Sequence, residues 1–457
     1  MKPEEELREL VNLDLKIKKL GEQIYDSPIQ LYDDDYTDDY SIFVPDYERV
    51  LTTVDYSLIN KIGHEGFTAP SFEKAGPREK LFFKPGDTVS AIVTCGGLCP
   101  GLNAVIRSIV LMNYYRYGNK IVYGFKYGYA GMVKEFGHEV VMLTPELVTQ
   151  IHTKGGTILG SSRGNQEPVK MVDRLEELGV DILYTIGGDG TQRGGMDIIK
   201  EIERRGLKIS VVGIPKTIDN DINFIDKSFG TETAFSEATN AIYSAHTEAK
   251  DAYYGVGVVK LMGRDSGFIA ANATLATGMV NICLIPEQDF DLEGEHGVLA
   301  EIERKLLEKK HVLVVVAEGA GQKYLLDPAN IQRDASGNVK MGDAGVFVRD
   351  AIKKYCDLKK IPVAMRYIDP SYMIRSVPPT PNDSIFCLQL AQMAVHAAMS
   401  GRTGMVVGYA NGHFTHLPME VATSKRKKIS LMSQLWQSVL EATGQPITFS
   451  LDRNGSK

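Results

Sequence analysis

Short apolar runs rich in β-branched residues recur from Thr88 onward and predict β-strands. The expected strands are Val89–Thr94, Ile121–Phe125, Ile182–Ile186, Ile209–Ile214, Val256–Leu261, Ile282–Ile285, Val312–Val316, Val363–Ile368 and Met405–Tyr409. Between most of them lie longer segments with the apolar period of a helix, among them Asn103–Tyr117, Val169–Leu178, Thr231–His246, Val298–Leu307 and Ser384–Met399. This alternation predicts an α/β protein whose parallel sheets are covered by helices on both faces. In such sheets, ligands bind beyond the carboxyl ends of the strands.

The first 85 residues have a different pattern. A charged segment of helical periodicity, Glu4–Glu22, is followed by the acidic, tyrosine-rich stretch Tyr32–Tyr40. This pattern predicts a solvated extension that packs loosely on the main body of the protein. An arm that regulates the protein or contacts another subunit is the alternative.

Composition narrows the classes of function. The 457 residues suggest about two or three domains. A net charge of −7 argues against a nucleic-acid partner, which requires a concentrated basic face. Five sparse cysteines do not form a disulfide framework. The charged N-terminus lacks the apolar core of a signal peptide, and the longest apolar run, Val312–Ala317, is too short to span a bilayer. We therefore expect a cytoplasmic protein with no membrane partner.

Two glycine-rich turns follow expected strands. The first is Cys95–Asn103 (CGGLCPGLN), where glycines allow close backbone approach and a helix start offers N–H groups to phosphate. A turn that needs glycine only for packing is the alternative. The second is Ile186–Thr191 (IGGDGT), which suits a phosphate cradle with Asp189 placed to hold Mg²⁺. Here the alternative is an aspartate that caps the next helix. The second turn indicates nucleotide-dependent phosphoryl transfer without choosing the acceptor.

Two further motifs carry charged groups. In Gly213–Asp221 (GIPKTIDND), the carboxylates of Asp219 and Asp221 can face one cleft if the segment stays extended. Phosphoryl transfer to an alcohol needs a group that accepts the hydroxyl proton and cations that balance charge, and Asp219 and Lys216 suit these roles. In Lys260–Gly267 (KLMGRDSG), Arg264 lies at a strand-to-helix turn, where an arginine can clamp phosphate. A surface salt bridge is the alternative.

In this order and spacing, the four motifs resemble those of the phosphofructokinase family, over roughly residues 70 to 420. Ala75–Lys80 and Tyr367–Arg375 are similar to the longer ATP-dependent branch of plants and trypanosomatid protists. The resemblance implies two Rossmann-like parallel-sheet domains of the phosphofructokinase type with an N-terminal extension, in a homotetramer. The implied divisions are an extension, 1–85, a nucleotide-binding domain, 86–230 with about 376–430, and a sugar-phosphate-binding domain, 231–375 with about 431–457.

The resemblance also implies site residues. Those at ATP are Gly97, Arg163, Gly188, Asp189, Gly190 and Thr191, with Asp189 on the magnesium side. Those at the sugar phosphate are Thr217, Ile218, Asp219, Met262, Gly263, Arg264, Glu318, Arg366, Tyr372, Met373, Ile374 and Arg375. Catalysis is assigned to Asp219 as base, with Thr217, Lys216 and Arg264 around the transferring group. Glu318 is expected on the sugar hydroxyls, Tyr372 and Arg375 on the 6-phosphate, and Arg366 in the neighbouring subunit's site.

The chain departs from the short bacterial enzymes of the family at one position. Nine residues before Arg264 they have an arginine that reaches the sugar phosphate of another subunit, and here that residue is Gly255. Lys260 or another cation is the expected substitute.

Two residues bear on the phosphoryl donor. Users of pyrophosphate have an acid after Gly-Gly-Asp, where this chain has Gly190, and a lysine before the threonine, where it has Lys216. A carboxylate near the α-phosphate would cost on the order of several kcal/mol, so Gly190 has more weight. The expected reaction transfers the γ-phosphate of ATP, with Mg²⁺, to the 1-hydroxyl of fructose 6-phosphate. The alternatives are a pyrophosphate-dependent phosphofructokinase and a nucleotide-dependent kinase of another acceptor.

Overall fold

The computed structural model of the chain describes residue 8 and residues 10–29, 42–333 and 339–450. The chain divides into two compact units. Unit 1 comprises residues 1–217, 222–230 and 377–426, and unit 2 comprises residues 218–221, 231–376 and 427–457. The described part of the expected extension, 1–85, belongs to unit 1.

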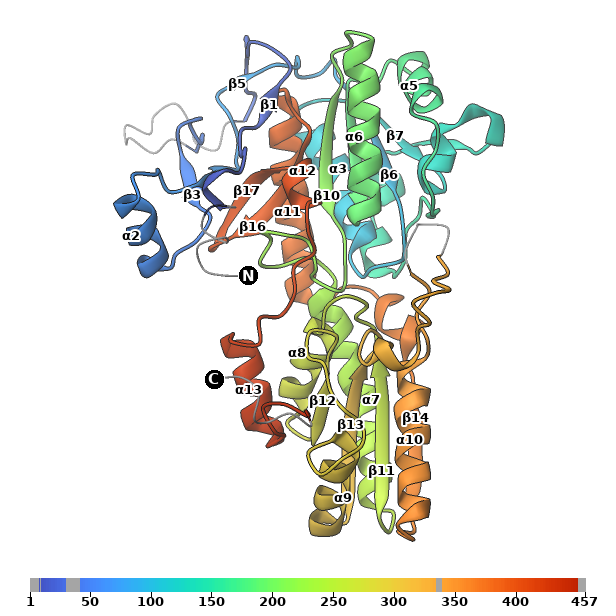
Figure 1. Cartoon of the computed structure of the whole chain (residues 1–457). Coiled ribbons are helices and arrows are strands. Elements are labelled where there is room, and N and C mark those ends of the chain that lie inside the picture. The colour runs from blue at the N-terminus through green and yellow to red at the C-terminus, as the bar shows by residue number, and fades with distance from the viewer. Residues whose placement is uncertain (1–7, 9, 30–41, 334–338, 451–457) are drawn as a thin grey trace. The chain divides into compact units, whose positions relative to one another are not determined.

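Unit 1 is built on a nine-stranded sheet (Figure 1). Its strands in spatial order are β3 (Arg49–Leu51), β4 (Ser71–Lys74), β17 (His413–Pro418), β16 (Met405–Ala410), β10 (Ser210–Pro215), β9 (Ile182–Gly187), β6 (Val89–Thr94), β7 (Ile121–Phe125) and β8 (Val140–Met142). The five from β16 to β7 are parallel, as the apolar runs predict, whereas the strands on both sides pair antiparallel. The parallel block aligns the carboxyl ends of β10, β9, β6 and β7 along one edge.

Helices cover both faces of this sheet. Helices α3 (Leu102–Tyr115) and α11 (Pro381–Met399) pack together on one face, and α5 (Pro168–Glu177), α6 (Asp189–Arg204) and α12 (Met419–Ala422) pack on the other. Alternation along β6 explains the two layers: Ala91 and Val93 join the core beneath α5 and α6, while the Ser90 hydroxyl donates to Asn113 of α3 at 3.1 Å. The smaller elements of unit 1 are β1 (Lys18–Lys19), β2 (Tyr25–Asp26), α2 (Tyr56–His64), β5 (Lys80–Leu81), α4 (Pro145–Val148) and β15 (Arg402–Thr403).

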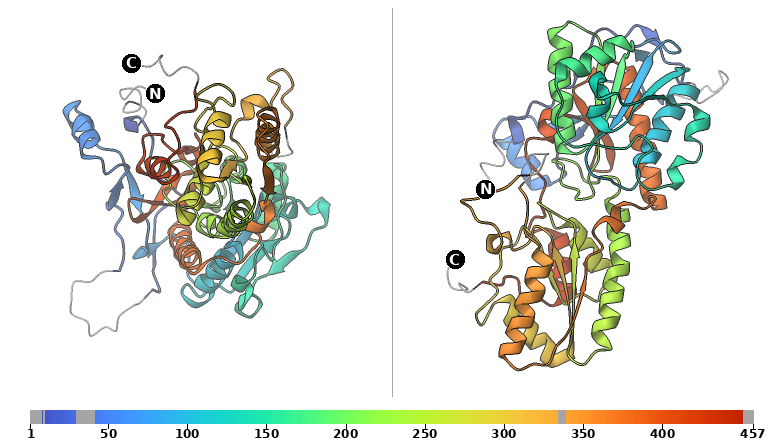
Figure 2. Two further views of the ribbon diagram at one scale, coloured as in Figure 1. Left: turned by 90° about the horizontal axis from the view of Figure 1, so that it is seen from below. Right: turned by 90° about the vertical axis from the view of Figure 1, so that its right-hand side faces the viewer.

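Unit 2 has a four-stranded, wholly parallel sheet. Its order is β12 (Ile282–Leu284), β13 (His311–Ala317), β11 (Gly255–Leu261) and β14 (Ala364–Ile368). Helices α7 (Thr231–Lys250) and α8 (Phe268–Thr277) contact the sheet on one face, and α9 (Val298–Lys309) and α10 (Ala344–Leu358) on the other; the right-hand view of Figure 2 shows α7 and α10 on opposite sides. Helix α13 (Gln434–Thr443) packs on α8. The described helices include none with the length and apolar content to cross a membrane.

The N-terminal prediction is wrong in two respects. Within Glu4–Glu22, the helical structure of the described residues ends at Val11. Lys18–Lys19 instead forms a strand, β1, which is paired with β15. The segment is also not loosely packed, since Leu15 and Ile17 are each only 6% exposed. The acidic stretch Tyr32–Tyr40 lies outside the described residues.

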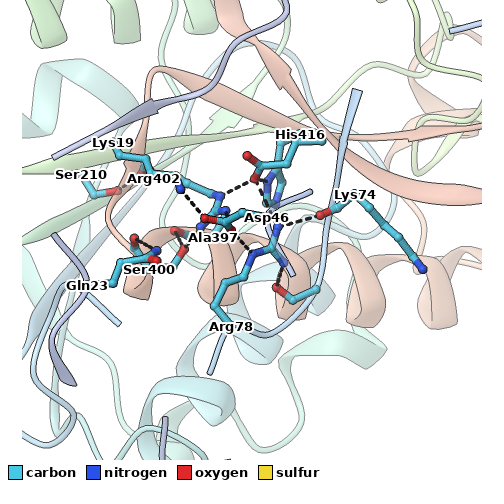
Figure 3. A network of polar contacts seen from close by, with 12 residues as sticks. Lys19, Gln23, Asp46, Lys74, Arg78, Ser210, Ala397, Ser400, Arg402 and His416 are labelled. Atoms are coloured by element: carbon cyan, nitrogen blue, oxygen red, sulfur yellow. Dashed lines mark hydrogen bonds and ion pairs between the residues drawn. The ribbon is translucent and has the colours of Figure 1, made fainter. Parts of the chain in front are cut away.

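A buried network of charges explains why the extension is held so firmly (Figure 3). Glu73 on β4 accepts bonds from Arg402, Arg78 and His416, at 3.2 Å from Arg78 and 2.7 Å from His416 Nδ1. Arg402, which is fully buried, also donates to Asp46 at 2.6 Å. Burial by itself raises the pKa of Glu73, but the contacts with His416 and Arg402 outweigh it and lower that pKa to about 2. A carboxylate therefore joins residues that are more than 300 positions apart.

Removing one partner from this network should cost far more than removing an exposed charge. We expect Arg402→Met to destabilise unit 1 by about 3–5 kcal/mol, because Glu73 stays buried with part of its charge uncompensated. Thermal unfolding followed by circular dichroism should show a Tm lowered by about 10 °C. The control is Lys200→Met, which breaks an exposed pair with Asp197 on α6 and should shift Tm by less than about 2 °C. Equal shifts in the two variants would contradict the anchoring role of the network.

Candidate active site

Lys216 connects two of the glycine-rich turns in unit 1. Its backbone N–H donates to Gly187 O at the end of β9 at 3.0 Å. Its Nζ donates to Gly97 O in the turn after β6 at 2.6 Å, and the residue is 6% exposed. The sequence-predicted residues Gly97 and Lys216 are thus brought together, with the second turn between them.

The turn after β6 requires glycine at particular positions. Gly96 has φ +85°, and a Cβ there would lie 3.2 Å from Lys216 Nζ. Gly101, the N-cap of α3, has φ +104°, and a Cβ there would meet Cys387 Sγ at 2.5 Å. Gly101 is therefore needed for packing, which was the alternative considered for this turn. At Gly96, by contrast, the group that approaches closely is a cationic side chain.

A second loop, residues 159–163, borders this turn. Gly96 donates its N–H to Ser162 O at 2.9 Å, and Ser161 Oγ donates to Gly96 O at 2.5 Å. These two bonds place Arg163, whose side chain is exposed, directly after the residues that contact the turn. Neither serine was singled out from the sequence, because a Ser-Ser pair carries no signal of its own.

Asp189 opens helix α6, with Gly188 as N-cap. Its carboxylate lies 3.3 Å from Arg193 one turn later, and its side chain is 25% exposed. Gly187 cannot carry a side chain, because a Cβ would lie 2.1 Å from Thr191 Oγ1. At Gly190, by contrast, an added Cβ would meet no atom within 4 Å. The second turn therefore presents a carboxylate at a helix N-terminus, with open space at the next residue.

The third motif passes from unit 1 into unit 2 after Thr217. The condition under which Asp219 and Asp221 would face one cleft, an extended segment, is not met: Ile218–Asp219 forms a turn and Asn220 has φ +52°. Asp221 is consequently only 6% exposed, while Asp219 is partly exposed. Ser266 Oγ donates to Asp219 O at 2.8 Å, which holds this turn on the fourth motif.

Glu318 and Arg264 lie at adjacent strand ends of unit 2. Glu318 follows β13 and donates its N–H to Leu261 O of β11 at 2.9 Å, and Gly319 donates to Gly263 O at 3.0 Å. Two glycines permit this approach, since a Cβ on Gly319 would lie 1.9 Å from Arg264 O and Gly263 has φ +132°. Burial raises the pKa of Glu318, and the charges of Arg264, Lys260 and Arg375 oppose that shift.

Lys260 faces a pair of carboxylates. Its Nζ lies 2.6 Å from Asp369 and 3.2 Å from Asp343. Burial lowers the pKa of Lys260, but the hydrogen bonds to Asp369 and Asp343 and the charges of Tyr367 and Asp369 together outweigh burial and raise that pKa above its ordinary value. Gly255 begins β11 with no room for a side chain, because a Cβ would lie 1.9 Å from Ala249 O. The structure thus gives Lys260 acidic partners of its own, and its use as a substitute cation stays a prediction.

The remaining predicted substrate residues lie in different environments. The Arg375 guanidinium lies 4.8 Å from the ring centre of Tyr372, which is 69% exposed. Met373 is exposed, whereas Ile374 is fully buried and cannot offer its side chain to a ligand. Arg366 pairs with Glu248 of α7 at 2.9 Å and sits opposite Gly257, four residues before the end of β11. Arg366 is therefore not part of the group around Glu318.

Glu287 is not among the residues expected from the sequence. Its carboxylate accepts the N–H groups of Gly267, at 3.0 Å, and Ile429, at 2.9 Å, and so fixes the turn that begins α8. Burial is the main reason that the pKa of Glu287 is raised. A carboxylate directly after an expected strand is the signal that identified Asp189, and it was available here in Ile285-Pro286-Glu287.

Comparison with known proteins agrees with this geometry. The family model described as phosphofructokinase matches residues 89–398. An ATP-dependent 6-phosphofructokinase of Borreliella burgdorferi is 47% identical, covering 96% of this chain and 98% of that protein. An ATP-dependent 6-phosphofructokinase of Trypanosoma brucei brucei is 48% identical, covering 81% of this chain and 76% of that protein. The ATP-dependent 6-phosphofructokinase 7 of Arabidopsis thaliana is 46% identical, covering 85% of this chain and 79% of that protein. The expected likeness to plant and trypanosomatid enzymes is confirmed.

Solved structures show the same fold. A pyrophosphate-dependent phosphofructokinase of Marinobacter aquaeolei has a TM-score of 0.64 at 18% identity, covering 81% of this chain and 94% of that one. The T-state phosphofructokinase of Pichia pastoris has a TM-score of 0.61 at 21% identity, covering 82% of this chain and 38% of that one. With a family match over more than half of its residues and relatives of nearly its whole length, the chain belongs to the phosphofructokinase family.

Proposed function

We propose that this protein transfers the γ-phosphoryl group of ATP to the 1-hydroxyl of fructose 6-phosphate, giving fructose 1,6-bisphosphate and ADP. The segment Lys216–Asp219 carries the proposal. At one end Lys216 is bonded to the glycine-rich turn of unit 1, and at the other Asp219 is held on the Arg264 turn of unit 2. Cation and base are therefore three residues apart in one chain segment. Relatives that are 45–48% identical are named ATP-dependent 6-phosphofructokinases, which supports the same donor and acceptor.

The donor residues belong to unit 1. Phosphate groups bind well at glycine-rich turns that precede helices, and the turns after β6 and β9 both lead into helices, α3 and α6. The open space at Gly190 leaves room for the α-phosphate of a nucleotide. Lys216 serves ATP or pyrophosphate equally, so Gly190 decides for ATP. Pyrophosphate use and another acceptor are the less favoured alternatives.

The residues present fit a magnesium ion that arrives with the nucleotide. Mg²⁺ binds through one or two carboxylates together with phosphate oxygens and water. Asp189 offers one such carboxylate, partly exposed at the start of α6. Across the described residues, groups of three or more metal-binding side chains are absent, so these residues form no closed metal cage. When bound, Mg²⁺ would neutralise charge on the phosphates.

The acceptor residues belong to unit 2. Asp219 takes the proton of the 1-hydroxyl, Glu318 binds the sugar hydroxyls, and Arg375 with Tyr372 binds the 6-phosphate. Arg264 and Lys216 balance the charge that spreads over the transferring phosphoryl oxygens. Most of the rate enhancement then comes from positioning and electrostatics rather than from covalent chemistry. A homotetramer in which Arg366 serves a neighbouring subunit stays a prediction.

A donor assay tests the proposed function. The purified protein should form fructose 1,6-bisphosphate from fructose 6-phosphate with ATP and Mg²⁺, and should not do so with pyrophosphate. Turnover with pyrophosphate alone would keep the acceptor and the base but reverse the role given to Gly190. No turnover with either donor, in a sample whose melting temperature fructose 6-phosphate does not raise, would contradict the acceptor.

Gly190→Asp should selectively weaken the binding of ATP. A carboxylate in the open space beside the phosphates adds like-charge repulsion, so we expect KM for ATP to rise at least about tenfold. Gly190→Asn has nearly the same size without the charge and is the matched control. If the two variants raise KM equally, bulk rather than charge governs this position.

Asp219→Ser should lower kcat by about 10²- to 10⁴-fold, because general base catalysis typically contributes that much. Binding of ATP, measured by calorimetry, should be unchanged, since Asp219 faces the acceptor. Asp357→Ser, at an exposed position of α10, is the control. A kcat close to wild type in Asp219→Ser would remove Asp219 from the base role.

A further inference from the structure

Tyr127 has a backbone conformation that tyrosine rarely adopts. It follows β7 after one intervening residue and has φ +61° and ψ +44°, in the left-handed region. A bulky residue is strained in this region, whereas glycine is not. Gly128, the next residue, also has a positive φ of +65°. The chain thus keeps an aromatic side chain where the backbone favours glycine, and such outliers concentrate at functional sites.

The Tyr127 ring is held in place yet remains accessible. A Cβ on Gly160 would lie 2.8 Å from the ring, so glycine at that position makes room for it. The ring of His138 lies 5.0 Å away at a tilt of 60°. Tyr127 is nevertheless 49% exposed, which leaves a substantial part of its aromatic surface without protein contact.

The loop against which Tyr127 packs is the loop that contacts the first glycine-rich turn. Tyr127 donates its N–H to Leu159 O at 2.8 Å, and two and three residues later Ser161 and Ser162 bond to Gly96. A Cβ on Gly128 would lie 3.1 Å from Ser162 N and 3.2 Å from Cys95 Sγ. A single loop therefore separates the exposed ring from the turn that contains Gly97.

The strand order sets the direction in which a nucleotide extends. At the carboxyl ends of β10, β9, β6 and β7 lie, in that order, Lys216, Asp189, Gly97 and Tyr127. Three strand spacings separate β10 from β7, about 14 Å at about 4.8 Å each. In ATP, two further phosphates and a ribose separate the transferred phosphoryl group from the base. With that group near Lys216 and the other phosphates over the two turns, a nucleotide extended along this edge brings its base to β7.

We propose that Tyr127 is a specificity-determining residue for the donor, whose exposed ring stacks on the purine base of ATP. The inference rests on the proposed function, because it takes ATP as the donor and the turns after β6 and β9 as its phosphate site. Stacking on an aromatic ring discriminates a nucleotide from a bare polyphosphate, since only the nucleotide has a base. Tyr127 thus gives the site a reason to prefer ATP over pyrophosphate that is separate from the space at Gly190.

The test uses a variant that removes the ring without straining the fold. Tyr127→Gly relieves the left-handed conformation, so its Tm should equal or exceed that of the wild type. Its KM for ATP should rise about 5- to 100-fold. The inhibition constant of inorganic tripolyphosphate, which has phosphates but no base, should be unchanged, as should KM for fructose 6-phosphate. Tyr127→Phe, which keeps the ring, should behave as the wild type.

A matched control is available in unit 2. Tyr254 also has a left-handed backbone, with φ +51°, and contacts Lys310 rather than any residue assigned to ATP. Tyr254→Gly makes the same chemical change and should leave KM for ATP unaltered. The proposal is overturned if Tyr127→Gly leaves KM for ATP unchanged. It is also overturned if the variant weakens the binding of tripolyphosphate as much as that of ATP, since the residue would then shape the phosphate turn. Calorimetric titration with ATP in the absence of sugar separates this failure from failure of the proposed reaction.

Discussion

The site in unit 1 depends on the hydrogen bond between Lys216 Nζ and Gly97 O, because this bond joins the turns that follow two strands that are not neighbours in the sheet. Lys216 follows β10 and Gly97 follows β6, with β9 and its Gly187–Gly188 turn between them. The lysine side chain therefore crosses the middle turn. A side chain on Gly96 would crowd its Nζ at 3.2 Å, so this glycine serves the lysine as well as any phosphate. Since a charged donor makes a strong hydrogen bond, the carbonyl of Gly97 and the cation fix each other.

Unit 2 uses the same device with backbone groups in place of a lysine. The turns after β11 and β13 are joined by the bonds from Glu318 to Leu261 and from Gly319 to Gly263, and both glycines approach other backbone atoms too closely for a side chain. Close backbone packing here determines where Arg264 and Glu318 lie. The resulting combination of a half-buried acid with a raised pKa and several cations is typical of functional sites. In both units, then, glycines position charged side chains and do not merely make space.

The parts of this protein that depend on local pattern were predictable, and the parts that depend on distant partners were not. Strands β6 and β7 match their expected bounds because buried parallel strands are continuously apolar. The extension was misjudged because its charges looked solvated, whereas Asp46 and Glu73 are both paired with Arg402. Glu73 also bonds to His416, and Arg78 donates to both carboxylates. No periodicity in residues 1–85 reveals partners at positions 402 and 416. Among the predicted site residues, Gly97 and Lys216 come from separate motifs and meet in the structure, whereas the burial of Ile374 depends on tertiary packing that no local pattern reveals.

Two residues other than glycine, Asn220 and Tyr127, have a left-handed backbone near the proposed site. Around the glycine-rich turns, positive φ is taken by Gly96, Gly101 and Gly263, as steric limits require. Asn220, between the two aspartates of the third motif, also takes it, which asparagine tolerates because its short polar side chain bonds locally. A tyrosine side chain cannot make such a local bond, and yet position 127 carries an exposed tyrosine. Phe224 and Tyr254 take positive φ as well, so this backbone conformation alone does not indicate a function. At Tyr127 it coincides with an exposed ring one loop away from the turn that contains Gly97, and this combination indicates that the ring itself is required.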